Sequence, residues 1–225
     1  TINGSLTGDG TIVVSGGTAN DAGGKLKATR NISENINISV ARYAEATLPN
    51  NYTSYGEIAI DDNGKLTVNG DLTTYGSVSV GANATLSSNV NVMGSGSLTN
   101  EGTITDNVEI DENASMTISS SKSSVGTITV DGSLEVNGSY TQSEAITVNA
   151  GADMTVTGDA YTANATLTVD GTLSVSGCDF NASNKLVVGD NATISFDNSD
   201  VSVSSYDFNG TTNVDNSTFV VGGTE

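Results

Sequence analysis

A pattern of about 20 residues recurs along most of this chain, and it constrains the fold more than any other feature of the sequence. In the clearest unit, residues 126–138, the alternating apolar positions are Ile128, Val130, Leu134 and Val136. They stand on either side of Asp131 and Gly132, a pair that favours a tight turn. Because alternate residues of a strand point to one face, each unit predicts two short strands joined by a bend.

Seven such units align along the chain. Their first apolar positions are Ile58, Val78, Val108, Ile128, Ile146, Leu167 and Leu186. The spacings are therefore 20, 30, 20, 18, 21 and 19 residues, so one long step interrupts an otherwise even period. A period near 20 is typical of a parallel β-helix, whose coils stack about 4.8 Å apart, whereas a propeller blade needs roughly 40 residues or more.

The sequence predicts an all-β chain that forms a single parallel β-helix, or β-solenoid, over residues 1–225. Parallel crossovers are generally right-handed, and the same hand is expected here. An antiparallel sandwich is the main rival, but it does not require equivalent residues to recur in register. Such register is clearest in Tyr140, Tyr161 and Phe180, spaced by 21 and 19 residues and expected to fill the core beneath a third sheet. About eleven coils would give a rod on the order of 50 Å long.

Two segments depart from the repeat. Residues 88–107 contain the long step, so a bulged coil or an outward loop is expected there. Residues 18–56 hold the only proline, Pro49, and predict an irregular cap or loop, with a short helix over Ser39–Leu48 that stops before it. A cap would cover the unpaired edges of a terminal coil, while a docking loop is the functional alternative.

Composition and charge exclude several classes of function. The chain has 26 Gly, no Trp and 36% hydrophobic residues, which suits a thin repetitive fold better than a deep globular core. Its net charge of −19 repels nucleic acid and anionic lipid, so nucleic-acid binding is not expected. No stretch approaches the roughly 20 apolar residues of a membrane span, and no basic-then-apolar leader opens the chain. Membrane insertion is therefore not expected, and the sequence reads as a mature or trimmed product.

Residues suited to catalysis are scarce, so we expect the chain not to be an enzyme. The sequence has no His, the commonest general base, and its carboxylates stand chiefly at turns, where they bond their own backbone. A polysaccharide-acting enzyme is the least favoured hypothesis. The single cysteine, Cys178, is expected to be a small buried residue, with an intermolecular bridge as the alternative. Oxygen ligands near Asp190 and Asp197 would suit Ca²⁺, but they match no calcium-loop spacing, so no cofactor is predicted.

Two sets of residues are candidates for sites. Twelve Asn-x-Ser/Thr sequons are candidate glycosylation sites: Asn3, Asn31, Asn37, Asn51, Asn83, Asn113, Asn137, Asn164, Asn181, Asn191, Asn209 and Asn216. A candidate contact segment near the N-terminus combines four of the seven cationic residues with three tyrosines: Lys25, Lys27, Arg30, Arg42, Tyr43, Tyr52 and Tyr55. A locally solvated face is the alternative interpretation of the cations.

Two runs carry a resemblance to known proteins. Val14-Ser15-Gly16-Gly17-Thr18-Ala19 and Asp170-Gly171-Thr172-Leu173-Ser174-Val175 resemble repeats of β-helical passenger domains of autotransporter adhesins and of microbial surface-layer and sheath proteins. The likeness covers most of the chain and brings no binding residue with it. It implies an extracellular location at the cell surface and a structural or adhesive role.

Two functions follow as expectations. The first is a structural subunit of a surface layer, sheath or filament that associates with itself through the ends or edges of the solenoid. The second is an adhesin or binding stalk that presents residues 18–56 or 88–107 to a host-surface or glycan receptor.

Overall fold

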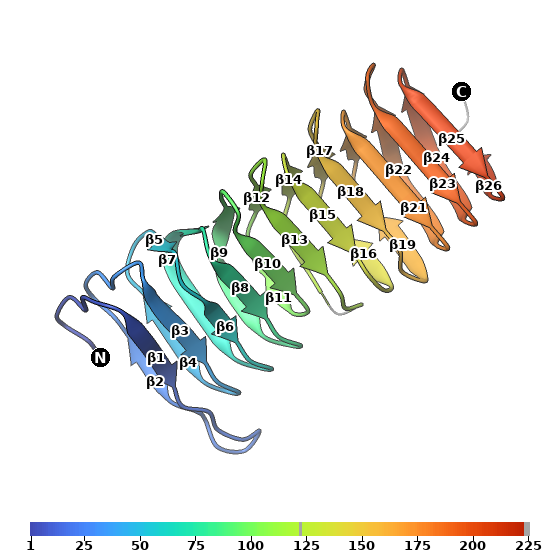
Figure 1. The fold of residues 1–225 in the computed structure, drawn as a ribbon. Helices are drawn as coiled ribbons and strands as arrows, with labels where there is room; N and C mark the ends of the chain where they lie inside the picture. The colour runs from blue at the N-terminus through green and yellow to red at the C-terminus, as the bar shows by residue number, and fades with distance from the viewer. Residues whose placement is uncertain (122, 223–225) are drawn as a thin grey trace.

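The computed structural model describes residues 1–121 and 123–222, and it confirms the predicted parallel β-solenoid (Figure 1). The chain winds into a rod, with the N-terminus at one end and the C-terminus at the other. All paired strands are parallel, and they belong to two sheets that face each other across the core. The described residues contain no helix.

The first sheet takes one strand from each coil. Its eleven strands, in order, are β1 (Gly10–Val14), β3 (Ile36–Val40), β6 (Ile58–Ile60), β8 (Ser77–Val80), β10 (Ser97–Asn100), β13 (Ser115–Ile118), β15 (Ser133–Val136), β18 (Asp153–Val156), β21 (Thr172–Ser176), β23 (Thr193–Asp197) and β25 (Thr211–Asp215). Equivalent residues of successive coils pair directly, as Ile58 does with Val78 and Val78 with Leu98.

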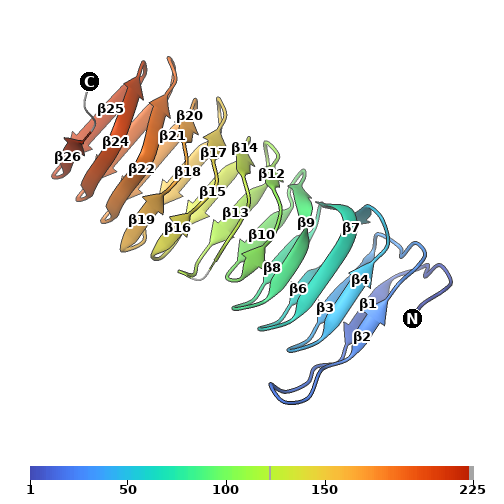
Figure 2. The same ribbon diagram turned by 180° about the vertical axis from the view of Figure 1, so that it is seen from behind.

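The second sheet has 15 strands, and the described coils cross it in up to two segments, so that it contains two columns. The first column contains β2 (Lys25–Lys27), β4 (Glu45–Leu48), β11 (Thr103–Ile104), β16 (Tyr140–Gln142), β19 (Ala160–Ala163) and β26 (Thr218–Val221). The second column contains β5 (Tyr52–Ser54), β12 (Val108–Ile110), β14 (Ile128–Val130), β17 (Ile146–Val148) and β20 (Leu167–Val169). Four long strands run through both columns: β7 (Lys65–Thr74), β9 (Thr85–Val92), β22 (Asp179–Val188) and β24 (Asp200–Phe208). Figure 2 shows the rod from behind.

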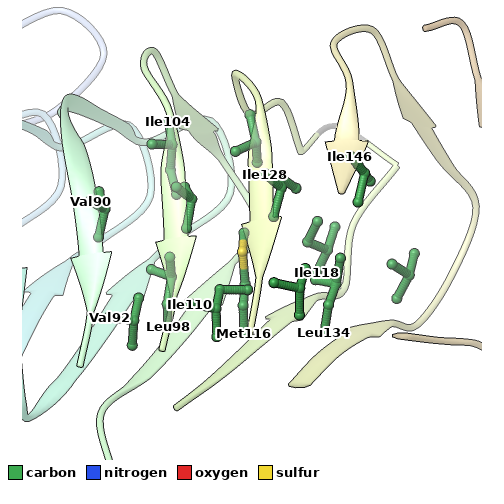
Figure 3. Close-up of a cluster of buried hydrophobic side chains, with 14 of the residues drawn as sticks. Val90, Val92, Leu98, Ile104, Ile110, Met116, Ile118, Ile128, Leu134 and Ile146 are labelled. Atoms are coloured by element: carbon green, nitrogen blue, oxygen red, sulfur yellow. The ribbon is translucent and has the colours of Figure 1, made fainter. Parts of the chain in front are cut away.

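The core lies between the two sheets and runs the length of the rod. Alternate residues of each strand point inward, and Figure 3 shows Val90 and Ile110 of the second sheet near Leu98 and Met116 of the first. These four side chains are at most 1% exposed. Each aliphatic side chain buried in this way contributes about 1.5–3 kcal/mol, which is how a chain with thin coils acquires a stable interior.

Residues 88–107 do not form the predicted bulged coil or outward loop. They contain the end of β9, β10 and β11, which pair in register with neighbouring coils. The apparent 30-residue step has a different origin, because Val78 lies in the first sheet whereas Val108 lies in the second column. The coil equivalent of Val78 is Leu98, at the ordinary spacing.

Residues 18–56 are also more regular than predicted. The helix expected over Ser39–Leu48 is wrong, because this stretch contains the end of β3, a turn and β4. Its alanines alternate in a strand pattern, with Ala46 and Leu48 buried in the core, so packing against the neighbouring coils overrides the local helix propensity. Residues 15–24, between β1 and β2, leave the coil as a longer loop (Figure 1).

Candidate ligand-contact site at a corner of the rod

Three stacked turns form a ridge where the first sheet passes into the first column. They comprise residues 41–44, 61–64 and 81–84, and we call them the corner ridge. Each turn is closed by the same hydrogen bond, in which the N–H of the last residue donates to the carbonyl oxygen of the first, at 2.9, 2.7 and 2.9 Å. The third residue of each turn has a left-handed backbone, with φ of 59° at Tyr43, 59° at Asn63 and 56° at Asn83.

Tyr43 is the unusual member of this series. Asn tolerates the left-handed region because its short polar side chain can bond locally, whereas a bulky aromatic residue is strained there, at a cost of about 1–3 kcal/mol. The guanidinium carbon of Arg42 lies 5.3 Å from the centroid of the Tyr43 ring. This cation–π contact holds the ring in a defined position.

The loop of residues 15–24 is fixed against the same turn. Gly17 N donates to Arg42 O at 2.8 Å, and Gly23 N donates to Tyr43 O at 3.0 Å. A Cβ on Gly23 would lie only 2.7 Å from that carbonyl oxygen, so the close approach depends on glycine. Backbone bonds between Thr18 and Asp21, at 2.9 and 3.1 Å, close the tip of the loop.

Two hollows flank this turn. The first, of about 460 Å³, lies between the loop and the ridge; its polar lining includes Asn20, Asp21, Tyr43, Glu45, Asn63, Lys65 and Asn83. The second is lined on the first-sheet side by Arg42, Asp61, Asp62, Ser79, Thr99 and Glu101, among others. Amides, carboxylates, a cation and an aromatic ring therefore meet at one corner, a combination that can hydrogen-bond and stack against a small polar molecule.

The structure brings together only part of the predicted contact segment. Arg42 and Tyr43 share the corner ridge, and Lys25 lies beside the first hollow, with its Nζ 3.0 Å from a carboxylate oxygen of Glu45. Lys27 is exposed further along β2, and Arg30 follows that strand. The segment is therefore dispersed along the first column and does not form one patch.

Two of the predicted tyrosines lie elsewhere. Tyr52 is buried in the second column, where its hydroxyl donates to Ser33 O at 3.2 Å and to Ile36 O at 3.3 Å. Burial, reinforced by Glu34, raises the pKa of Tyr52 to about 12. Tyr55 is exposed between the second column and the first sheet, and its ring stacks on Tyr75 with centroids 4.8 Å apart.

The sequons remain candidate glycosylation sites, and the structure shows how their side chains are engaged. Asn37 Oδ1 accepts a hydrogen bond from Glu57 N at 2.8 Å, and Asn51 Oδ1 accepts one from Asp71 N at 3.0 Å. Each side chain therefore satisfies a backbone N–H group of the next coil. Asn137 Oδ1 accepts from a threonine hydroxyl at 2.7 Å. Exposed sequon asparagines include Asn3, Asn31, Asn51, Asn83, Asn113, Asn164, Asn181, Asn191, Asn209 and Asn216.

The predicted contact segment did not include several polar lining residues: Asn20, Asp21, Glu45, Asn63, Lys65 and Asn83, of which Asn83 was predicted only as a glycosylation sequon. A signal for the two ridge asparagines was present, because Tyr43, Asn63 and Asn83 recur every 20 residues. Their meeting with Asn20 could not be predicted, since it depends on how the loop folds back over the ridge.

Cys178 is buried, as predicted, and burial raises the pKa of its thiol to about 11. The thiol therefore stays protonated and unreactive at neutral pH.

Within residues 1–121 and 123–222, no three His, Cys, Asp or Glu side chains are grouped so as to hold a metal ion. The described part of the chain also lacks any helix with the length and apolar character needed to cross a membrane. Comparisons with protein-family models, with curated proteins and with solved structures find no match for this chain.

Proposed function

We propose that the chain is an extracellular structural subunit of a microbial cell-surface assembly, such as a surface layer, sheath or filament, in which solenoids associate end to end. The observation that carries this proposal is the strand-on-strand stacking of the coils, in which each coil is the template for the core and the strands of the next. Phe208, Val214 and Val221 occupy core positions of the repeat, yet they are 48%, 45% and 47% exposed. Their partners one coil earlier, Val188, Phe196 and Val203, are at most 1% exposed.

The exposed part of these side chains faces along the rod axis, where a further coil would stack. Among the described residues, β25, β26 and residues 205–208 of β24 pair with no following strand, so they present backbone groups in that direction. An apolar core surface bordered by open strand edges is a template for another strand layer, and a second solenoid of the same kind supplies one. Each inward residue that becomes covered would add hydrophobic stabilisation.

Parallel stacking favours contact between opposite ends, because each coil pairs with the preceding coil on one side and with the following coil on the other. Residues 186–222 contain five Asp and no Lys or Arg, so two C-terminal ends repel each other. A repeated head-to-tail contact that does not close on itself produces a filament.

Electron microscopy and sedimentation of the purified chain, over a concentration series, test this proposal. We expect filaments or stacked rods that lengthen with concentration, and we expect Val221→Lys to abolish them by placing a charge on the axial surface. Val220→Lys is the matched control, because Val220 lies in the same strand and pairs with the exposed Ser202, so its side chain points outward. Monomeric rods at every concentration would overturn the proposal, as would filaments that survive Val221→Lys.

An adhesin or binding stalk is the second candidate function. It is favoured by the loop of residues 15–24, which is hydrogen-bonded to the corner ridge and lines the first hollow on the side of the rod. Shortening this loop to a tight turn separates the two functions. Loss of adhesion to cells with intact end-to-end assembly would support the adhesin, whereas unchanged adhesion would exclude this loop as its contact.

A further inference from the structure

We propose that the corner ridge and the loop of residues 15–24 form a binding site for a neutral oligosaccharide, with the ring of Tyr43 as the face on which a sugar ring stacks. The site lies on the side of the rod, away from the axial surface that carries the proposed assembly. It therefore adds a ligand-binding activity to the structural role and does not depend on it.

The first argument is the strain at Tyr43. Three consecutive turns share one hydrogen-bond pattern and one left-handed position, and two of them fill it with Asn63 and Asn83, which suit that backbone. The remaining turn carries an aromatic residue that the backbone disfavours. Strain of this kind is characteristic of functional sites, where the side chain is needed for something other than the stability of the turn.

The second argument is the chemistry of the first hollow. Asn20, Asn63 and Asn83 each offer an amide that both donates and accepts hydrogen bonds, which matches hydroxyl groups that do the same. An aromatic face beside several such groups suits a sugar ring, which has an apolar C–H face and a polar rim. A hollow of about 460 Å³ lies within the size range of small-molecule sites.

The third argument is the charge of the hollow, which selects a neutral ligand. Asp21 and Lys65 line it with opposite charges, and Glu45 is paired with Lys25 at 3.0 Å. The four charges cancel, so the hollow has no excess cation to attract an acidic sugar. The surrounding chain, with a net charge of −19, repels one.

The site is also preorganised. Backbone bonds from Gly17 and Gly23 fix the loop to the turn, and Arg42 supports the ring of Tyr43 from 5.3 Å. A ligand would therefore lose little affinity to ordering the protein.

The decisive variant is Tyr43→Asn, which gives the first turn the residue found at the equivalent position of the next two. We expect it to fold with a melting temperature equal to or higher than that of the parent chain, because the strain is relieved. Binding should weaken about tenfold or more, because the stacking face is lost. Tyr55→Ser is the control, since it removes an exposed tyrosine at a different corner and should leave binding unchanged.

Binding is measured by ¹⁵N NMR titration with cellohexaose, xylohexaose, mannohexaose and maltohexaose in turn. At least one of the four should shift the backbone amides of Asn20, Tyr43, Asn63 and Asn83 in a saturable way. The proposal is overturned if none of the four binds, if the shifts map to another surface, or if Tyr43→Asn binds as well as the parent. Sugar binding and end-to-end assembly are tested separately. Tyr43→Asn changes the corner ridge and not the rod ends, whereas Val221→Lys changes one rod end and not the corner ridge.

Discussion

The two halves of the rod share the same sheets but place their wide turns at different corners. In the N-terminal half, the four-residue turns 41–44, 61–64 and 81–84 connect the first sheet to the first column. From the turn 93–96 onward, and in the C-terminal half at 111–114 and 149–152, the four-residue turns connect the second column to the first sheet instead. The polar turn that marks each repeat in the sequence therefore changes its place in the coil partway along the rod, while the strands keep their register.

The interiors of the halves differ as well. The first column is aliphatic near the N-terminus, where Leu66 pairs with Leu86. Towards the C-terminus it becomes aromatic, as Tyr140, Tyr161 and Phe180 pair in register with ring centroids 6.2 and 5.2 Å apart. Similar sheets thus enclose two kinds of core.

The comparison is tested most strongly by truncating one core side chain in each half. Phe180→Ala should lower the free energy of unfolding by about 3–5 kcal/mol, because a fully buried ring is lost from between Tyr161 and Phe196. Leu86→Ala, in the aliphatic column, should cost about 2–5 kcal/mol and less than the ring. Denaturant unfolding followed by circular dichroism measures both, and a larger loss for Leu86→Ala would show that the aromatic column is not the more cohesive core.

Short turns in the C-terminal half are the next point of comparison. Two-residue turns alternate with the four-residue ones, and Gly171 rests against the carbonyl oxygens of Asn149 and Ala152 in the wide turn of the preceding coil. A Cβ at Gly171 would clash with both, so Gly171→Ala should destabilise the fold by roughly 1–3 kcal/mol.

The control for that variant is Gly151→Asn in the wide turn itself. Gly151 has φ of +88° and open space around its Cβ position, and Asn is the residue that best tolerates a left-handed backbone. Its effect should be about 1 kcal/mol, since backbone strain is added without a clash, and smaller than that of Gly171→Ala. Equal losses of melting temperature in the two variants would show that close stacking of the turns does not matter.

The shift of the wide turn explains how far the sequence could predict the fold. Alternating apolar residues and Asx-Gly turns indicated a parallel solenoid with coils of about 20 residues, and the register of Tyr140, Tyr161 and Phe180 was predicted correctly. The third sheet predicted above them was wrong, because their strands belong to the second of two sheets in the described chain. The alignment of the repeats was wrong between Val78 and Val108. It matched the polar turn of each unit, although the strands before that turn belong to different sheets. Nothing in a single sequence distinguishes a turn that has changed corners from a coil that has gained residues.

The candidate site was predictable only in part, for a related reason. Arg42 and Tyr43 stood out as a cation and an aromatic residue within an acidic chain. Tyr52 and Tyr55 are aromatic residues in the same segment of the sequence. Tyr52, however, is buried in the core, and Tyr55 stacks on Tyr75 at another corner. Residue type identified the candidates, but the coil geometry decided which of them could meet.

Hydroxyl groups of buried tyrosines give the smallest and most specific contrast between the halves. Tyr52, in the N-terminal half, donates to two backbone carbonyls, whereas the buried Tyr161 hydroxyl in the aromatic column has no hydrogen-bond partner among the residues that the structure describes. Tyr52→Phe should therefore cost about 1 kcal/mol at pH 7, while Tyr161→Phe should be neutral or stabilise by about 1 kcal/mol.

Alkaline pH should shift both Phe variants in the same direction relative to the parent chain, because burial raises the pKa of both hydroxyls, that of Tyr52 to about 12. Unfolded tyrosine ionises near pH 10, so the stability that each neutral hydroxyl contributes is complete below that pH and is lost as the pH rises through the folded pKa. Between pH 10 and pH 12 the parent chain should lose stability faster than either Phe variant. Unfolding free energies at about pH 7 and pH 11 measure this, and parallel losses in the parent and both variants would show that these tyrosines do not cause the alkaline sensitivity.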